Sequence, residues 1–195
     1  MLKKSTIDLF KRTFIIALVA ASVASCTAVE MAVEDRGSGD IGKDIKIKAA
    51  LTKDVVQAMG TDVIKIDADV YEQDVLLTGL VETRAQKSRA EQLADNVEGV
   101  KSVYNEILVI PPVDRRKGKV ENFIEDTVIE AKIKALLIDA TGVHMTNLRW
   151  QSVEGQVVLF GRALSSAERA KAEQIVRGVQ GVVSVKNLIK VKPKT

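Results

Sequence analysis

Apolar residues recur along this chain with two alternating spacings, and the same order of spacings occurs twice. Helical spacing comes first in each half, and Gly60 and Gly142 end the segments that show it. We therefore expect a helix before each of these glycines. The apolar stripes of the two helices are Ile45, Ala49, Thr52, Val56 and Met59 in the first half, and Ile129, Ile133, Leu136, Leu137 and Ala140 in the second.

The segments that follow these helices predict a β-hairpin, a second helix and a last strand. The predicted hairpin strands are 63–70 and 75–78 in the first half, and 148–153 and 156–160 in the second. Thr83-x-x-Gln86 and Ser165-x-x-Glu168 are capping boxes, so a helix begins at each of them. Alternating apolar residues near the end of each half predict a final strand. The predicted order is αββαβ, twice.

A comparison of the two halves indicates that they are copies of one unit. Residues 74–109 align with residues 156–191 without a gap and are identical at 15 of 36 positions. Upstream, residues 46–49 match residues 132–135 once the spacing is widened by four residues, which predicts a loop of different length in the two copies. The predicted boundaries are 41–110 for the first repeat, 111–122 for the linker and 123–192 for the second repeat.

The N-terminal segment has the pattern of a secretory signal peptide. Four basic residues precede an apolar run from Phe14 to Ala24, and small residues follow it. These 11 residues are too few to span a bilayer as a helix, which takes about 20.

The end of this run also predicts a lipid anchor. The sequence Val23-Ala24-Ser25-Cys26 resembles a bacterial lipobox, so residues 1–25 are interpreted as a lipoprotein signal peptide. Cys26 would then carry acyl chains that hold the protein on a membrane, and residues 26–40 would form a flexible tether. Thr27, instead of aspartate, after the cysteine resembles the sorting pattern for the outer membrane. The alternative is a secreted protein whose cysteine happens to lie at the cleavage site.

Charge and composition narrow the function further. The predicted leader holds four of the 29 basic and one of the 26 acidic residues, so 25 of each remain and give no support for nucleic-acid binding. Cys26 is the only cysteine and His144 the only histidine, which leaves no basis for a disulfide, a metal site or a cofactor. We expect His144 to be a loop or strand-edge side chain. Acidic residues such as Asp126, Asp139 and Glu154 form no recognisable catalytic pair, so we predict that the protein is not an enzyme.

The repeat carries a family resemblance. An αββαβ unit with Val-x-Leu-x-Gly before its second helix and Val-x-Gly-Val-x-x-Val after it resembles the BON domain. A lipobox followed by two such units resembles the dual BON-domain lipoproteins of the bacterial outer membrane, which face the periplasm. The resemblance implies an α+β fold of two tandem BON domains, each with a three-stranded mixed sheet covered by two helices.

The second repeat is the positive part of the chain. Residues 26–40 and 41–110 each have a net charge of −3, whereas residues 111–195 have +6. Basic residues near an anionic bilayer contribute about 1 kcal/mol each to membrane binding. The candidate phospholipid-binding residues are Arg115, Arg116, Lys117, Lys119, Lys132 and Lys134. The family resemblance also implies that an aromatic residue on the opening helix of the second repeat contacts phospholipid. Thr127 stands at that position here and Phe123 lies one turn earlier, so both are also candidate phospholipid-binding residues.

Two functions follow from these observations. The first is a lipid-anchored module that binds anionic phospholipid, such as phosphatidylglycerol or cardiolipin, through its second repeat and supports envelope integrity. The second is an adaptor that docks protein partners of the envelope, with incidental lipid contact.

Overall fold

A computed structural model provides the structure of the protein, and it describes residues 34–60, 66–110 and 119–193, with side chains from residue 125 onward in the last segment. The chain divides into Met1–Glu34 and a compact unit, Asp35–Thr195. The first repeat contains α2 (Ser38–Met59), β1 (Ile66–Tyr71), β2 (Asp74–Val81), α3 (Arg84–Asp95), β3 (Ser102–Asn105) and β4 (Leu108–Val109). The second contains α4 (Lys119–Ile138), the short 3-10 helix η3 (Met145–Asn147), β5 (Leu148–Val153), β6 (Gln156–Ala163), α5 (Ser166–Arg177), β7 (Ser184–Asn187) and β8 (Lys190–Val191).

Each repeat forms one mixed sheet with its longest strand in the centre. In the first repeat β1 pairs antiparallel with β2, while β3 and β4 both pair parallel with the other side of β2. The second repeat has the same pairing around β6. Thus β3 and β4, like β7 and β8, are two parts of one edge strand. The predicted α+β fold with two αββαβ units and three-stranded mixed sheets is confirmed.

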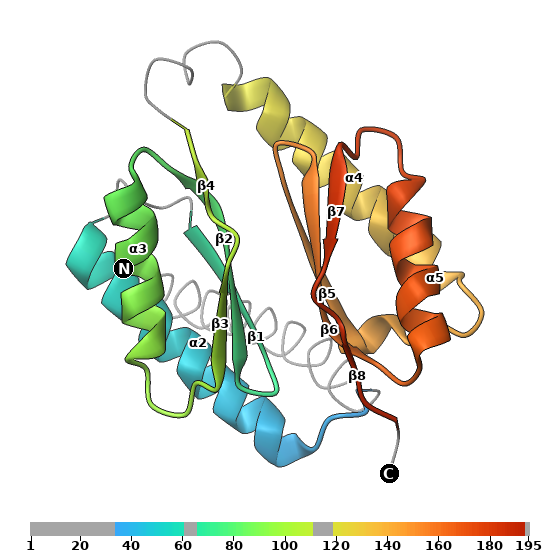
Figure 1. Ribbon diagram of the computed structural model, residues 1–195, viewed down its shortest axis with the longest axis horizontal. Helices are drawn as coiled ribbons and strands as arrows, with labels where there is room; N and C mark the ends of the chain where they lie inside the picture. The colour runs from blue at the N-terminus through green and yellow to red at the C-terminus, as the bar shows by residue number, and fades with distance from the viewer. Residues whose placement is uncertain (1–33, 61–65, 111–118, 194–195) are drawn as a thin grey trace, which may run out of the picture. The chain divides into compact units, whose positions relative to one another are not determined.

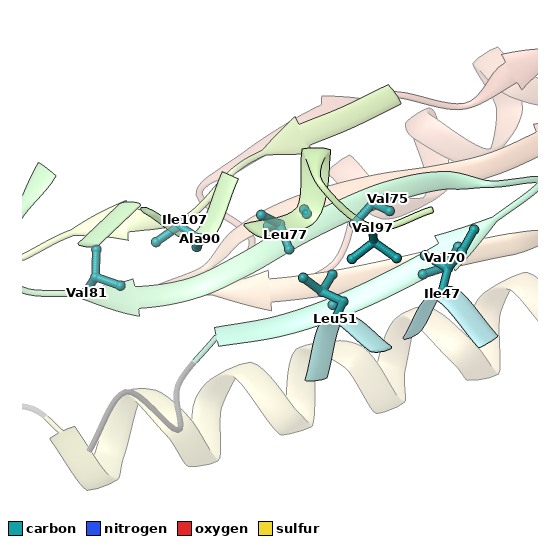
Figure 2. Close-up of a cluster of buried hydrophobic side chains, with 11 residues drawn as sticks. Ile47, Leu51, Val70, Val75, Leu77, Val81, Ala90, Val97 and Ile107 are labelled. Carbon is teal, nitrogen blue, oxygen red and sulfur yellow. The ribbon is translucent and has the colours of Figure 1, made fainter. Parts of the chain in front are cut away.

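Two helices cover one face of each sheet and enclose its core. In the first repeat, α2 and α3 lie on one face of the sheet (Figure 1). Their side chains pack against alternate residues of β1 and β2. Figure 2 shows Leu51 on α2 and Val97 after α3 near Val75 and Leu77 of β2. Alternation follows from the pleat, which directs successive side chains to opposite faces of a strand.

A buried aspartate ties each opening helix to the hairpin of its own repeat. Asp44 on α2 is buried, and its carboxylate accepts hydrogen bonds from the backbone N–H groups of Glu72 and Gln73, at 2.8 and 2.7 Å. Asp126 on α4 accepts from the N–H groups of Glu154 and Gly155, at 2.8 and 2.9 Å. These bonds satisfy the amides of a tight turn and fix the helix against it.

This pairing corrects the predicted loop difference between the repeats. Asp44 and Asp126 are 82 positions apart, as are Gly60 and Gly142, so the opening helices align without a gap. The match of residues 46–49 with 132–135 was therefore wrong by four residues. Four residues are close to one helical turn of 3.6, so the displaced alignment kept apolar residues in register.

Most of the predicted stripe of α2 was also wrong, although its last residue, Met59, packs against the core. Ile45 and Val56 are 59% and 46% exposed, whereas Ile47 and Leu51 are buried in the core. The buried stripe contains Asp44, and a carboxylate at its centre makes that stripe look polar in the sequence. On α4 the prediction was better, because Ile129, Ile133 and Leu137 are buried as expected, although Leu136 is 49% exposed.

The capping boxes differ between the repeats. At α3 both halves form: Thr83 Oγ1 accepts from Gln86 N at 3.2 Å, and Gln86 Oε1 accepts from Thr83 N at 2.9 Å. At α5, Ser165 Oγ accepts a hydrogen bond from Glu168 N, which is one of the two hydrogen bonds of the predicted capping box. The buried Glu168 carboxylate instead accepts from the N–H groups of Leu164 and His144. His144 lies in the loop before η3, as predicted, and Glu168 holds that loop against α5.

The helix-free faces of the two sheets pack against each other. Tyr71 and Leu76 from the first repeat form a buried cluster with Val158 and Phe160 from the second. Tyr104 meets Phe160 edge-on, with ring centroids 5.9 Å apart. Burial of these faces adds apolar contact that a single repeat of about 70 residues would lack.

Ion pairs surround this cluster, and the first repeat supplies the acids. Glu72 pairs with Lys192 and with Arg162, whose Nη1 lies 3.0 Å from its Oε1. Lys190 Nζ lies 2.5 Å from Asp74 Oδ2. The pairing explains much of the charge difference between the repeats. Several cations of the positive second repeat serve the contact between the sheets.

The residues that precede α2 lie across both repeats. Asp35 and Asn147 exchange two hydrogen bonds of 2.9 Å, one through the Asp35 backbone N–H and one through its carboxylate. Arg36 pairs with Asp44 and lies 4.6 Å from the centroid of the Tyr71 ring. Structured contacts therefore begin inside the segment 26–40, and α2 starts at Ser38.

Candidate functional site

The candidate site is the face of α4 that points away from its sheet. Its inner side is held by Asp126 and by two contacts to Glu130. Trp150 Nε1 donates to the Glu130 backbone oxygen at 3.2 Å, and Ser152 N donates to its carboxylate at 2.8 Å. These bonds set the rotation of α4 about its own axis. The opposite side of the helix must therefore face outward.

Apolar side chains run along that outward side. Val128 is 45% exposed and Ile138 is 59% exposed, and both are large hydrophobic residues that water contacts directly. Ala131 and Ala135 are exposed between them at helical spacing. We name these four residues the α4 outer ridge. Leu136, also exposed, lies beside it.

Two lysines border the α4 outer ridge. With 3.6 residues per turn, Lys132 and Lys134 project from opposite flanks of it. Both are exposed, and neither forms an ion pair with any residue that the structure describes. Long lysine side chains can lay their methylene groups along an apolar surface while the ammonium reaches a polar layer. An apolar strip with lysines at both edges is typical of helices that lie at a membrane interface.

A loop of the second repeat exposes another apolar residue and lies beside the middle of α4. Val183 is 77% exposed, and its backbone N–H donates to Gly155 O at 2.8 Å. Gly181, two residues earlier, lies against the Ile129 side chain. The corresponding residue of the first repeat is Lys101, whose N–H donates to Gln73 O in the same way. The second repeat thus has a valine where the first has a cation.

Three of the predicted lipid-binding residues lie on α4 and have side chains that the structure describes. Thr127, Lys132 and Lys134 are all exposed on α4. Lys119 and Phe123 belong to α4, but their side chains lie outside the described part of the structure. Cys26, Arg115, Arg116 and Lys117 also lie outside the described residues. Sequence reasoning missed Val128, Ile138 and Val183, although the first two share a helical spacing with Ala131 and Ala135.

The acidic residues near α4 have structural roles. Asp126 accepts from Ser152 Oγ at 2.6 Å in addition to the turn amides. Burial raises the pKa of Glu130, and the nearby carboxylates of Asp126, Asp67 and Asp69 raise it further, against the opposing effect of the Ser152 N–H.

Within the described residues no three His, Cys, Asp or Glu side chains gather as a metal site, and no helix there has the length and hydrophobicity to cross a membrane.

The chain belongs to the BON-domain family. The family matches residues 43–111 and 125–193, which together cover most of the chain. Each matched segment contains one αββαβ unit except for the first residues of its opening helix.

Two relatives resemble this chain over most of its length. Osmotically-inducible protein Y of Escherichia coli is 37% identical over 148 residues, which are 75% of this chain and 70% of that protein. Outer membrane lipoprotein DolP of Haemophilus influenzae is 31% identical over 192 residues, which are 94% of this chain and 95% of that protein. The predicted resemblance to dual BON-domain proteins of this kind is confirmed.

Proposed function

We propose that the protein is a non-enzymatic lipoprotein on the periplasmic side of the outer membrane, and that it binds anionic phospholipid through the α4 outer ridge. An acylated Cys26 holds it at the membrane, and lipid binding by the second repeat supports envelope integrity. The observation that carries this proposal is the exposed apolar ridge of α4 between Lys132 and Lys134. The similarity to an outer membrane lipoprotein over nearly the whole chain supports the location.

The chemistry of the ridge favours a bilayer surface. Val128 and Ile138 can enter the boundary between head groups and acyl chains, which removes their apolar surface from water. Lys132 and Lys134 would then lie at the depth of the phosphates. Each contributes about 1 kcal/mol near an anionic surface, and salt weakens that contribution.

Co-sedimentation with vesicles tests the proposal. The test protein starts at Thr27 and keeps the whole compact unit, Asp35–Thr195. We expect V128E/I138E to weaken its binding to phosphatidylglycerol vesicles by at least about tenfold, because glutamate opposes both apolar insertion and the anionic surface. Replacing Lys132 and Lys134 with glutamine should cost roughly 30-fold at low salt.

A matched variant controls for charge alone. S88E/Q92E places two glutamates on exposed positions of α3 in the first repeat, and we expect it to bind like the parent protein. Phosphatidylcholine vesicles should bind weakly, and added salt should release the protein from phosphatidylglycerol. No binding of the parent protein at low ionic strength contradicts the proposal and favours a protein adaptor.

The anchor is tested separately in living cells. We expect radiolabelled palmitate to enter the full-length protein and C26S to lose the label, because the thiol is the acylation site of a lipobox. Membrane fractionation should then find the parent protein in the outer membrane and C26S in the soluble fraction. Unlabelled parent protein that leaves the membrane in a salt wash would contradict a covalent anchor.

A further inference from the structure

The outer side of α2 carries the same pattern as the outer side of α4. Ile45 and Val56 are exposed, and Ala49 and Thr52 lie exposed between them at helical spacing. We name these four residues the α2 outer ridge. These are four of the five residues of the apolar stripe that the sequence predicts for this helix. A well-packed core already exists beneath α2 without them.

Lysines border the α2 outer ridge as well. Lys46 and Lys53 are exposed on the same side of the helix, and neither forms an ion pair with a described residue. Other cations of α2 are engaged: Lys43 lies 3.4 Å from Asp40, and Lys48 lies 3.3 Å from Asp69. The charge beside the ridge is therefore positive, which suits an anionic surface.

The packing of the sheets directs the two ridges away from each other. Helices α2 and α3 cover one face of the first sheet, and its other face meets the second sheet through Tyr71 and Leu76. The far face of the second sheet is covered by α4 and α5 (Figure 1). The layers therefore follow the order helices, sheet, sheet, helices. One flat bilayer cannot contact the outer sides of both helix layers.

We propose that the α2 outer ridge is a second binding site for an anionic lipid surface, so that one molecule can bridge two bilayers. This inference rests on the proposed lipid binding by α4. The shared chemistry of the ridges gives them the same class of ligand. Because the two ridges face in opposite directions, each would bind a different bilayer.

Vesicle clustering tests the bridge. The chain from Thr27 is mixed with phosphatidylglycerol vesicles of uniform size, and particle diameter is followed by dynamic light scattering. We expect the diameter to rise at least twofold with the parent protein. I45E/V56E should abolish this rise while the protein still co-sediments with vesicles, because α4 is intact. S88E/Q92E should cluster vesicles like the parent protein.

A second measurement separates bridging from dimerisation of the bound protein. V128E/I138E should retain weak sedimentation through α2, and the addition of I45E/V56E should remove it. The inference is overturned if the parent protein sediments with vesicles without clustering them, or if I45E/V56E clusters them normally. In both of those outcomes lipid binding by α4 stands. If the parent protein does not sediment at all, both proposals fail.

Discussion

Replacing Gly161 with alanine is expected to lower the free energy of unfolding by about 3 kcal/mol. Gly161 lies in β6 with a φ of +110°, where residues with a Cβ are strained. An added Cβ would lie 2.3 Å from the backbone oxygen of Asn147, closer than real contacts allow. The buried Asn147 would have to shift, together with its hydrogen bonds to Asp35. Urea denaturation of the parent protein and of G161A gives the difference.

Gly178 supplies a matched control at the end of α5. Its φ of −81° is ordinary helical backbone, and an added Cβ would lie 3.4 Å from the Ile175 oxygen. We expect G178A to change the unfolding free energy by less than about 1 kcal/mol. Equal losses for G161A and G178A would show that the close approach at Asn147 does not determine the requirement for glycine.

The local structure of each repeat could be predicted because its signals lie close together in the sequence. Thr83 and Gln86 are three residues apart and form their capping box as expected. Gly60 follows the last residue of α2, as predicted, whereas α4 ends at Ile138, four residues before the predicted end at Gly142. What the sequence could not explain was the reason for glycine in the centre of β6. That reason is the close approach of the Asn147 backbone to Gly161. The repeat comparison shows only that glycine occupies the same position in both repeats, as Gly79 and Gly161.

The buried side of α2 could not be predicted from hydrophobicity. Two apolar stripes run along this helix, and the stripe without an acidic residue appears the better candidate for the core. The structure buries the other, because the turn at Glu72 and Gln73 needs the carboxylate of Asp44. A side chain that satisfies distant amides is invisible to a periodicity argument. The same limit concealed the outward apolar residues of α2 and α4.

The different net charges of the two repeats are consistent with a contact between the sheets, but they do not show which residues form it. Net charges of −3 and +6 indicated a difference between the repeats, which sequence reasoning assigned to lipid binding. The structure shows that Arg162, Lys190 and Lys192 instead meet acids of the first repeat. Residues such as Glu72 and Lys192 are 120 positions apart, and no local pattern links them. Lys132 and Lys134 on α4 take part in none of these three ion pairs.

Replacing Glu72 with glutamine should lower the unfolding free energy by about 2–3 kcal/mol. The change removes the negative charge between Arg162 and Lys192 and keeps the size of the side chain. The Glu72 and Arg162 side chains are only 11% and 13% exposed, so water cannot replace the lost partner well. Glu106 provides the control, because its partner Lys186 is 56% exposed, and E106Q should cost less than about 1 kcal/mol.

The pH dependence of stability gives Glu72 a second, independent readout. Burial by itself would raise the pKa of Glu72, but hydrogen bonds from Lys192 and Arg162 outweigh it and hold the pKa below the ordinary value of 4.5. The unfolded chain therefore takes up a proton first as the pH falls, so this contribution is present above pH 4.5 and is lost as the pH falls through the folded pKa. The parent protein should lose stability in that range, and E72Q should lose less. Parallel curves for the two proteins would mean that Glu72 is not charged and paired in the folded state.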